Sequence, residues 1–268
     1  MIFRSERRDS AIGRPVLAWI GLMLMAVSFI WLQLLPPRAV SHRSAFTPPT
    51  AGPFRVVVID PGHGGKDSGT MKGGISEKDL TLDIARRAER LLQTRGMTTL
   101  MTRADDSYVP LPGRAALANE QHDCIFISIH FDDAARSVAT GIETYYAAHQ
   151  ISKLHRALSW LPFLQSTALD SSNAESERLA AIMQESLVAR TQALNRGTRP
   201  EQFFVIANVH HPAVLIEGGF LTNRDDVSKL ATEDYRQQIA AAISDGVMRY
   251  REVLQQQQTA LAVSSSGR

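Results

Sequence analysis

From residue 54 onward, short apolar runs alternate with longer segments whose apolar residues recur at helical spacing. The apolar runs predict strands near residues 54–59, 97–101, 123–129, 141–146, 202–206 and 213–216. The longer segments predict helices near residues 79–95, 111–121, 176–194 and 232–254. Strands that are apolar throughout are buried on both faces, as in a parallel sheet covered by helices. The sequence therefore predicts an α/β fold with a mainly parallel, twisted sheet and helices on both of its faces.

A different pattern precedes this domain. Residues 16–35 contain no charge, and a helix of 20 residues is long enough to cross the roughly 30 Å hydrocarbon core of a bilayer. The run exceeds the 7–15 residues typical of the apolar core of a signal peptide, so it predicts a transmembrane anchor rather than a cleaved signal. Residues 36–53 hold five prolines and predict either a semi-rigid spacer or a disordered join.

Arginines at positions 4, 7, 8 and 14 precede the apolar run, and fewer basic residues follow it closely. Because positive residues favour the cytoplasmic side, residues 1–15 are predicted to be cytoplasmic and the rest extracytoplasmic. The chain is thus expected to be membrane-anchored with an extracytoplasmic domain, in preference to a secreted protein. The domain is expected to span residues 54–254, followed by a polar, disordered tail at 255–268.

Charge and cysteine content argue against nucleic-acid binding and against catalysis by a cysteine nucleophile. The net charge of +2 over 268 residues provides no basic footprint for nucleic acid. The single cysteine, Cys124, excludes an internal disulfide, and its apolar surroundings predict a small buried side chain rather than a nucleophile.

Chemically active residues follow three of the predicted strands. His63 lies in a glycine-rich turn after the first strand, His130 ends the strand that begins near residue 123, and Glu217 ends the strand that begins near residue 213. Glu77 precedes the first predicted helix and can return to the same edge. Ligands of open α/β sheets bind beyond the carboxyl ends of the strands. Two histidines and one glutamate with an open fourth position form the ligand set of a catalytic zinc site.

Spacing alone makes this hypothesis only moderately specific, because a single histidine is more often structural than a ligand. The glycine-rich turn is no phosphate loop, since Asp67 stands where both the Walker and the dinucleotide motifs need another residue. His210 is predicted either to line the cleft or to end the strand beside it. The candidates for the substrate cleft are Asp132, His210 and Asn223.

Four ordered sequence blocks carry a more specific signal. They are VVIDPGHGGKD at 57–67, EKD at 77–79, ISIH at 127–130 and PAVLIEGGFLTN at 212–223. In these blocks the chain resembles the zinc-dependent N-acetylmuramoyl-L-alanine amidases, the amidase 3 family of bacterial cell-wall hydrolases. The resemblance covers about residues 55–250.

The resemblance implies a phosphorylase/hydrolase-like α/β domain with one zinc ion on His63, Glu77 and His130 and with Glu217 as the catalytic carboxylate. The implied substrate is peptidoglycan, cleaved at the amide between the lactyl group of muramic acid and L-alanine. A membrane-anchored zinc amidase is therefore expected, located at the bacterial inner membrane with a periplasmic domain. The alternatives are a catalytically silent wall-binding or regulatory protein and a zinc exopeptidase that acts on small peptides.

Two features depart from the family pattern. Phe131 stands where the family has a small residue, and its bulk is expected to reshape the cleft. Residues 147–173 form a variable insert, which predicts core packing, a helix on the membrane surface or a regulatory lid. Some relatives carry a helix in this region that blocks the zinc site until a protein activator displaces it, so an activator is a candidate partner.

Overall fold

The computed structural model describes residues 23, 54–72, 74–133, 138–150 and 173–266. The chain divides into two units, Met1–Thr50 and Ala51–Arg268, and every element named below belongs to the second. The predicted anchor at 16–35, apart from residue 23, and the predicted linker at 36–53 lie outside the described residues. None of the helices in the described ranges is long and apolar enough to cross a membrane.

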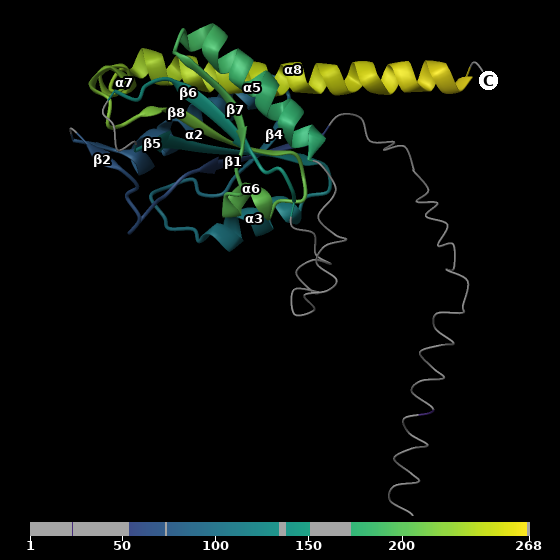
Figure 1. Ribbon diagram of the computed structural model, residues 1–268, viewed down its shortest axis with the longest axis horizontal. Coiled ribbons are helices and arrows are strands. Elements are labelled where there is room, and N and C mark those ends of the chain that lie inside the picture. Colours follow the sequence, from purple (N-terminus) through teal and green to yellow (C-terminus); the bar gives the residue numbers. More distant parts are fainter. Residues whose placement is uncertain (1–22, 24–53, 73, 134–137, 151–172, 267–268) are drawn as a thin grey trace, which may run out of the picture. The chain divides into compact units, whose positions relative to one another are not determined.

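One six-stranded sheet forms the middle of the domain (Figure 1). Its strands are β1 (Val56–Pro61), β4 (Thr98–Met101), β5 (Cys124–Asp132), β6 (Ile142–Tyr146), β7 (Asn195–Pro200) and β8 (Ala213–Phe220). The spatial order is β4-β1-β5-β8-β6-β7, and a separate hairpin joins β2 (Met71–Lys72) to β3 (Ile75–Ser76). The first four strands in this order are mutually parallel, whereas β6 pairs antiparallel with β8 and parallel with β7. The predicted mainly parallel sheet is confirmed, with two strands that run the opposite way.

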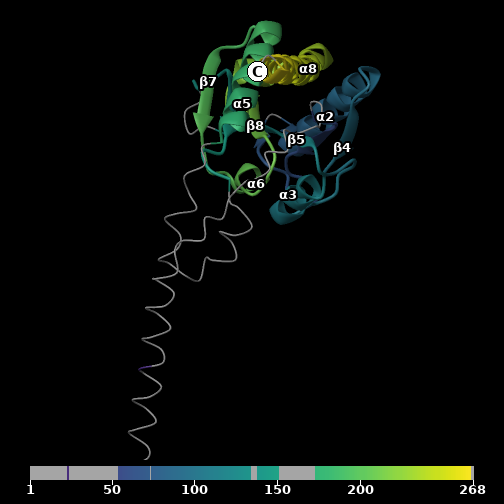
Figure 2. The same ribbon diagram turned by 90° about the vertical axis from the view of Figure 1, so that its right-hand side faces the viewer.

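Helices cover both faces of the sheet, as predicted (Figure 2). One face carries α2 (Glu77–Thr94), α5 (Ala174–Thr191), α7 (Arg224–Leu230) and α8 (Glu233–Ser266). The other carries the shorter α3 (Leu111–Asn119) and α6 (Phe204–Ala207).

Neighbouring residues of β1 show why the strands are apolar throughout. Val57 and Ile59 pack in the core cluster under α2, α5 and α8, whereas Val58 between them packs in the cluster under α3 and α6. All three side chains are fully buried, because a strand in the middle of a covered sheet has no solvent-facing side.

Two local predictions were wrong. Residues 202–206 were expected to form a strand, but the edge strand is β7 and the apolar run Phe204–Ala207 forms the short helix α6. A short apolar run cannot distinguish a strand from a buried helical turn. The tail at 255–268 was expected to be disordered, yet α8 continues to Ser266.

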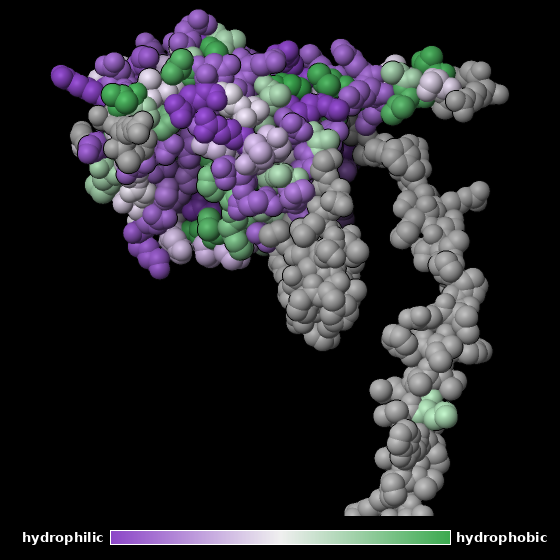
Figure 3. Space-filling model, viewed as in Figure 1, coloured by the Kyte–Doolittle hydropathy of each residue, from purple (hydrophilic) through white to green (hydrophobic). Residues whose placement is uncertain are grey.

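The composition of the tail explains the longer helix. Gln, Ala and Leu are good helix formers, and no glycine or proline interrupts the sequence between Gly246 and Gly267. Leu261 and Val263 remain exposed near the end of α8, where apolar side chains appear on the surface (Figure 3).

Candidate metal centre

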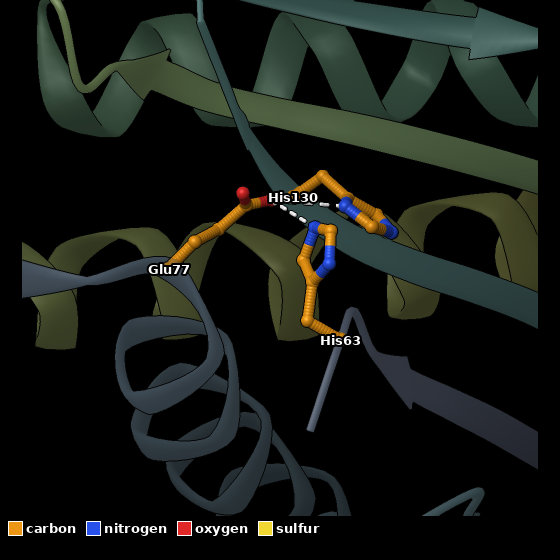
Figure 4. Close-up of side chains that lie close together, drawn as sticks. All are labelled: His63, Glu77 and His130. Atoms are coloured by element: carbon orange, nitrogen blue, oxygen red, sulfur yellow. Dashed lines mark hydrogen bonds and ion pairs between the residues drawn. The ribbon is translucent and has the colours of Figure 1, made fainter. Parts of the chain in front are cut away.

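Three of the predicted site residues converge in the structure (Figure 4). Glu77 Oε1 lies 2.9 Å from His63 Nε2 and 3.0 Å from His130 Nδ1. One ligand atom from each of the three residues lies within 4.8 Å of the others, so together they could hold a metal ion. Two imidazole nitrogens and one carboxylate oxygen are donors that suit zinc at a catalytic site.

Each of these residues is placed by a different element. His63 follows β1 and adopts a left-handed backbone conformation with φ of 60°, which is uncommon for a residue other than glycine. Glu77 is the first residue of α2, directly after the β2–β3 hairpin, and His130 lies near the carboxyl end of β5. Since β1 and β5 are parallel neighbours, their carboxyl ends deliver both histidines to the same edge of the sheet.

The carboxylate of Glu77 is almost completely buried, and both of its oxygens accept hydrogen bonds. Its Oε2 accepts a hydrogen bond from the backbone N–H of Thr70 at 2.9 Å, and Oε1 accepts one from Phe131 at 3.2 Å. Burial by itself would raise the pKa of Glu77, but its interactions with His130 and His63 outweigh burial and lower the pKa. Glu77 is therefore held as a carboxylate, which is the form that binds a metal.

Asp67 provides a contact that the sequence analysis did not identify. Its Oδ1 lies 3.0 Å from Nδ1 of His63, on the side of the ring opposite the nitrogen that faces Glu77. The angle at Nδ1 does not make this contact a hydrogen bond, but the negative charge of the carboxylate still favours the proton on Nδ1 and leaves the Nε2 lone pair for a metal. The only sequence signal was a carboxylate four residues after the histidine.

Two glycines make room for the ligand side chains. A Cβ atom at Gly62 would lie 2.3 Å from Cε1 of His130, and one at Gly69 would lie 2.5 Å from Oε2 of Glu77. Both distances are shorter than real contacts allow, so these positions require glycine for the rings and the carboxylate to occupy their places.

Buried polar groups hold the turn that carries His63. Arg114 donates hydrogen bonds to the backbone oxygens of Pro61 and His63 and forms an ion pair with Asp60 at 2.8 Å. Arg103 donates to the backbone oxygens of Pro61 and Gly62. Both arginines are about 3% exposed, so the turn is fixed from beneath by buried charges.

Glu217 lies beside the three converging residues. It is the partner of His130 in the parallel pair of β5 and β8, so the two side chains lie on the same face of the sheet. Its Oε2 is inaccessible to solvent and has no hydrogen-bond partner among the described residues. Burial, followed by the charges of Glu77, Asp132 and Glu143, raises the pKa of Glu217 well above that of an ordinary glutamate.

The remaining candidates differ in position. Asp132 is the last residue of β5, and Asn223 follows β8, where its side chain accepts hydrogen bonds from the first backbone N–H groups of α7. His210 precedes β8 and therefore lies at the opposite end of the strand from Glu217, so its assignment to the same cleft was wrong. Its position beside the strand in the sequence gave no information about which end of the strand carries the site.

The structure also corrects the interpretation of Phe131. Its side chain is 2% exposed and packs in the core on the face of the sheet opposite His130, where its ring would contact a Cβ at Gly218. Successive residues of a strand point to opposite faces, so a large residue next to a ligand does not intrude on the ligand's side.

The family model described as N-acetylmuramoyl-L-alanine amidase matches residues 57–249. Among curated relatives, the N-acetylmuramoyl-L-alanine amidase LytC of Bacillus subtilis is 34% identical over 194 residues, which cover 72% of this chain and 35% of LytC. The matched region contains all four of the predicted zinc and catalytic residues.

Solved structures of N-acetylmuramoyl-L-alanine amidases are also similar to this chain. An N-acetylmuramoyl-L-alanine amidase from Clostridium difficile 630 is similar with a TM-score of 0.64 at 32% identity, covering 75% of this chain and 98% of that one. The CwlD amidase from Clostridioides difficile, in complex with the GerS lipoprotein, is similar with a TM-score of 0.63 at 27% identity, covering 74% and 99%.

Proposed function

Because the chain belongs to the N-acetylmuramoyl-L-alanine amidase family, we propose that it hydrolyses the amide between the lactyl group of muramic acid and L-alanine in peptidoglycan. The observation that carries this proposal is the convergence of His63, Glu77 and His130, with Glu217 on the neighbouring strand. A catalytically silent relative would have no need to keep four such groups together at one edge of the sheet.

We propose that His63, Glu77 and His130 hold one zinc ion. When bound, zinc would lower the pKa of water and polarise the scissile carbonyl. Other residues of the chain hold the three ligand side chains in position. Asp67 keeps His63 in the tautomer that offers Nε2, and two backbone N–H groups hold the Glu77 carboxylate in place. Gly62 and Gly69 leave the space that these side chains occupy.

Glu217 is proposed as the general base and acid. Its carboxylate takes a proton from the attacking water and passes it to the leaving nitrogen of L-alanine. Burial and the neighbouring carboxylates raise the pKa of Glu217, which makes its carboxylate a stronger base toward the water proton than that of an ordinary glutamate. The Oε2 atom of Glu217 makes no hydrogen bond within the described residues, so no other protein group there competes for its proton.

The N-terminal segment supports a proposal about location. The uncharged run at 16–35, with arginines before it, would tether the domain to the outer side of the bacterial inner membrane. The full chain should partition with membranes, whereas a variant that lacks residues 1–35 should not. Recovery of both forms in the soluble fraction would reject the tether.

A protein activator is a second component of the proposal. CwlD, a similar amidase, has been solved in complex with the lipoprotein GerS. The segment 151–172 of the insert lies outside the described residues, whereas Ala147 at its start is buried in the core beside α6. If the insert acts as a lid, deletion of residues 151–172 should raise basal hydrolysis. Unchanged activity would leave packing or membrane contact as its role.

The decisive experiment is digestion of purified sacculi by the full chain, with and without a chelator, followed by mass analysis of the products. Free stem peptides released from intact glycan strands, with activity lost to the chelator and restored by zinc, are expected. Trimmed stems would indicate an exopeptidase. No release, under conditions where the protein still binds sacculi, would indicate a wall-binding protein.

A further inference from the structure

A row of ionisable side chains crosses the sheet from the metal centre toward its far edge. His130 on β5 pairs with Glu217 on β8, and Glu217 pairs in turn with Glu143 on β6. Residues that pair directly across neighbouring strands lie on the same face of a sheet. The row therefore runs along the face of the sheet that carries α3 and α6.

Two arginines of β7 end this row. Arg196 Nε lies 3.2 Å from Oε2 of Glu143, and Arg199 Nε lies 2.5 Å from its Oε1. Residues three apart on a regular strand point to opposite faces. Here the register between β6 and β7 shifts between Ile142 and Thr144, and Gly197 has φ of 83°, so both arginines reach the same carboxylate.

Glu143 is only 1% exposed, whereas the side chains of Arg196 and Arg199 are 27% and 54% exposed. The buried carboxylate thus acts as a template that holds two guanidinium groups at the surface. Arg196 donates a hydrogen bond from Nε to Oε2 of Glu143, whereas Arg199 forms an ion pair with Oε1 without a hydrogen bond. Arg196 is further restrained because its guanidinium lies over the ring of Phe220, 4.8 Å from the centroid.

Two arginines and one glutamate carry one net positive charge among them, and Asp132 offsets part of it because it interacts electrostatically with Arg196. Arg199 is 54% exposed and is thus accessible to a carboxylate supplied from outside. Guanidinium forks bind carboxylates in a defined orientation. The pair therefore has the character of an acceptor site for an acidic ligand and not only of a tie between two strands.

We propose, on the basis of the proposed amidase function, that Arg196 and Arg199 bind a carboxylate of the stem peptide and that Glu143 positions them. The glycan half of the substrate carries no carboxylate, because the lactyl carboxyl of muramic acid is in the scissile amide. A positive site beside the centre therefore faces the peptide half. The residue after L-alanine in stem peptides is a D-glutamate linked through its side chain, whose α-carboxylate is either free or amidated.

The spacing is compatible with that carboxylate. Strand β7 lies three strand spacings from β5, which amounts to about 14 Å. Two residues of extended peptide cover about 7 Å, and the arginine side chains project from β7 toward Glu143, back in the direction of the metal centre. The site would thus distinguish a free α-carboxylate at the second position from an amidated one.

The test uses the full chain and two muramyl tripeptides that differ only at the second residue, D-glutamate or D-isoglutamine. Wild-type protein should show kcat/KM about tenfold higher on the free carboxylate, and Arg199→Gln should remove this preference by raising KM for that substrate alone. Arg249→Gln is the matched control, because Arg249 is 55% exposed and pairs with Glu185 on the far face of the domain. Arg199→Lys should retain part of the preference.

Equal rates of wild-type protein on the two substrates, or a preference that survives Arg199→Gln, would overturn the proposal. Calorimetric measurement of binding to the peptide L-alanyl-γ-D-glutamate tests the arginine site separately from the proposed amidase function. Peptide binding that Arg199→Gln weakens about tenfold supports the arginine site even if neither substrate is hydrolysed, in which case the amidase proposal alone fails. Peptide binding that Arg199→Gln leaves unchanged rejects the arginine site even if hydrolysis is rapid.

Discussion

His130 and Glu217 pair across neighbouring parallel strands, so one proposed metal ligand and the proposed catalytic carboxylate are carried by the two middle strands of the sheet. The helices on both faces hold these strands, and the residues around them are fully buried. The distance between the two side chains is thus set by the backbone of the sheet and not by a loop. Their roles can be separated by changing one side chain at a time.

Glu217→Gln should abolish hydrolysis without removing the metal. The amide keeps the size of the carboxylate but cannot accept the proton of water, so loss of this group should lower kcat by about 10²–10⁴-fold. Zinc content, measured by atomic emission on the purified protein, should remain at one ion per chain. A variant that hydrolyses sacculi at the wild-type rate with zinc bound would contradict the role of Glu217.

Asp67→Asn should weaken metal binding. The asparagine removes the charge beside Nδ1 of His63 that holds the ring in its tautomer, and loss of such outer contacts typically costs 10–100-fold in metal affinity. Competition with a chromogenic chelator measures the affinity. Asp245→Asn is a matched control, since Asp245 is 39% exposed, compared with 46% for Asp67, and pairs with arginines away from the site. Equal affinities in the two variants would contradict the role of Asp67.

Gly62→Ala should disturb His130 directly. The added Cβ would lie 2.3 Å from the imidazole, so the ring must move or the backbone must shift, and such overpacking typically destabilises by about 1–3 kcal/mol. Zinc affinity should fall together with stability. Gly113→Ala is the control, because the closest atom to its Cβ is 3.5 Å away and the residue lies in helix α3. Wild-type zinc affinity in Gly62→Ala would show that the ring does not need this space.

The four central residues could be proposed from their positions at strand and helix ends, which parallel strands bring together, and the resemblance to the amidase family made the set specific. The contacts around them could not. The ion pairs of Glu143 depend on the register shift at Gly197 and on the antiparallel direction of β6, neither of which hydrophobic periodicity reveals. His210 was misplaced for a related reason, because adjacency to a strand in sequence does not distinguish its two ends.

The stability of the metal-free protein should depend on pH through Glu217. Burial is the main cause that raises the pKa of Glu217 in the folded state, and neighbouring carboxylates raise it further. A group whose pKa is higher in the folded than in the unfolded state stabilises fully below the unfolded pKa, and this contribution is lost as the pH rises through the folded value. With chelator present, the Tm of the wild type should therefore fall relative to that of Glu217→Gln as the pH rises above the range of an ordinary glutamate. Parallel Tm curves would contradict the shift.

The ion pair between Asp60 and Arg114 should contribute more to stability than any exposed pair. The two side chains are 1% and 3% exposed, and Asp60 also accepts hydrogen bonds from Thr102 and Ser128. Asp60→Ala leaves the Arg114 charge buried without its partner, which typically costs 3–5 kcal/mol, measured as the free energy of unfolding in denaturant.

A change in the exposed Glu185 provides the contrast to Asp60. Glu185→Gln removes a pair whose side chains are 60% and 55% exposed and should change the free energy of unfolding by no more than about 1 kcal/mol. Asp60→Ala should in addition lower zinc affinity, because Arg114 holds the backbone oxygen of His63 at 2.6 Å and would be free to shift. Equal stabilities of the two variants would show that the buried pair is compensated by its desolvation, and unchanged zinc affinity would show that Arg103 alone suffices to hold the turn.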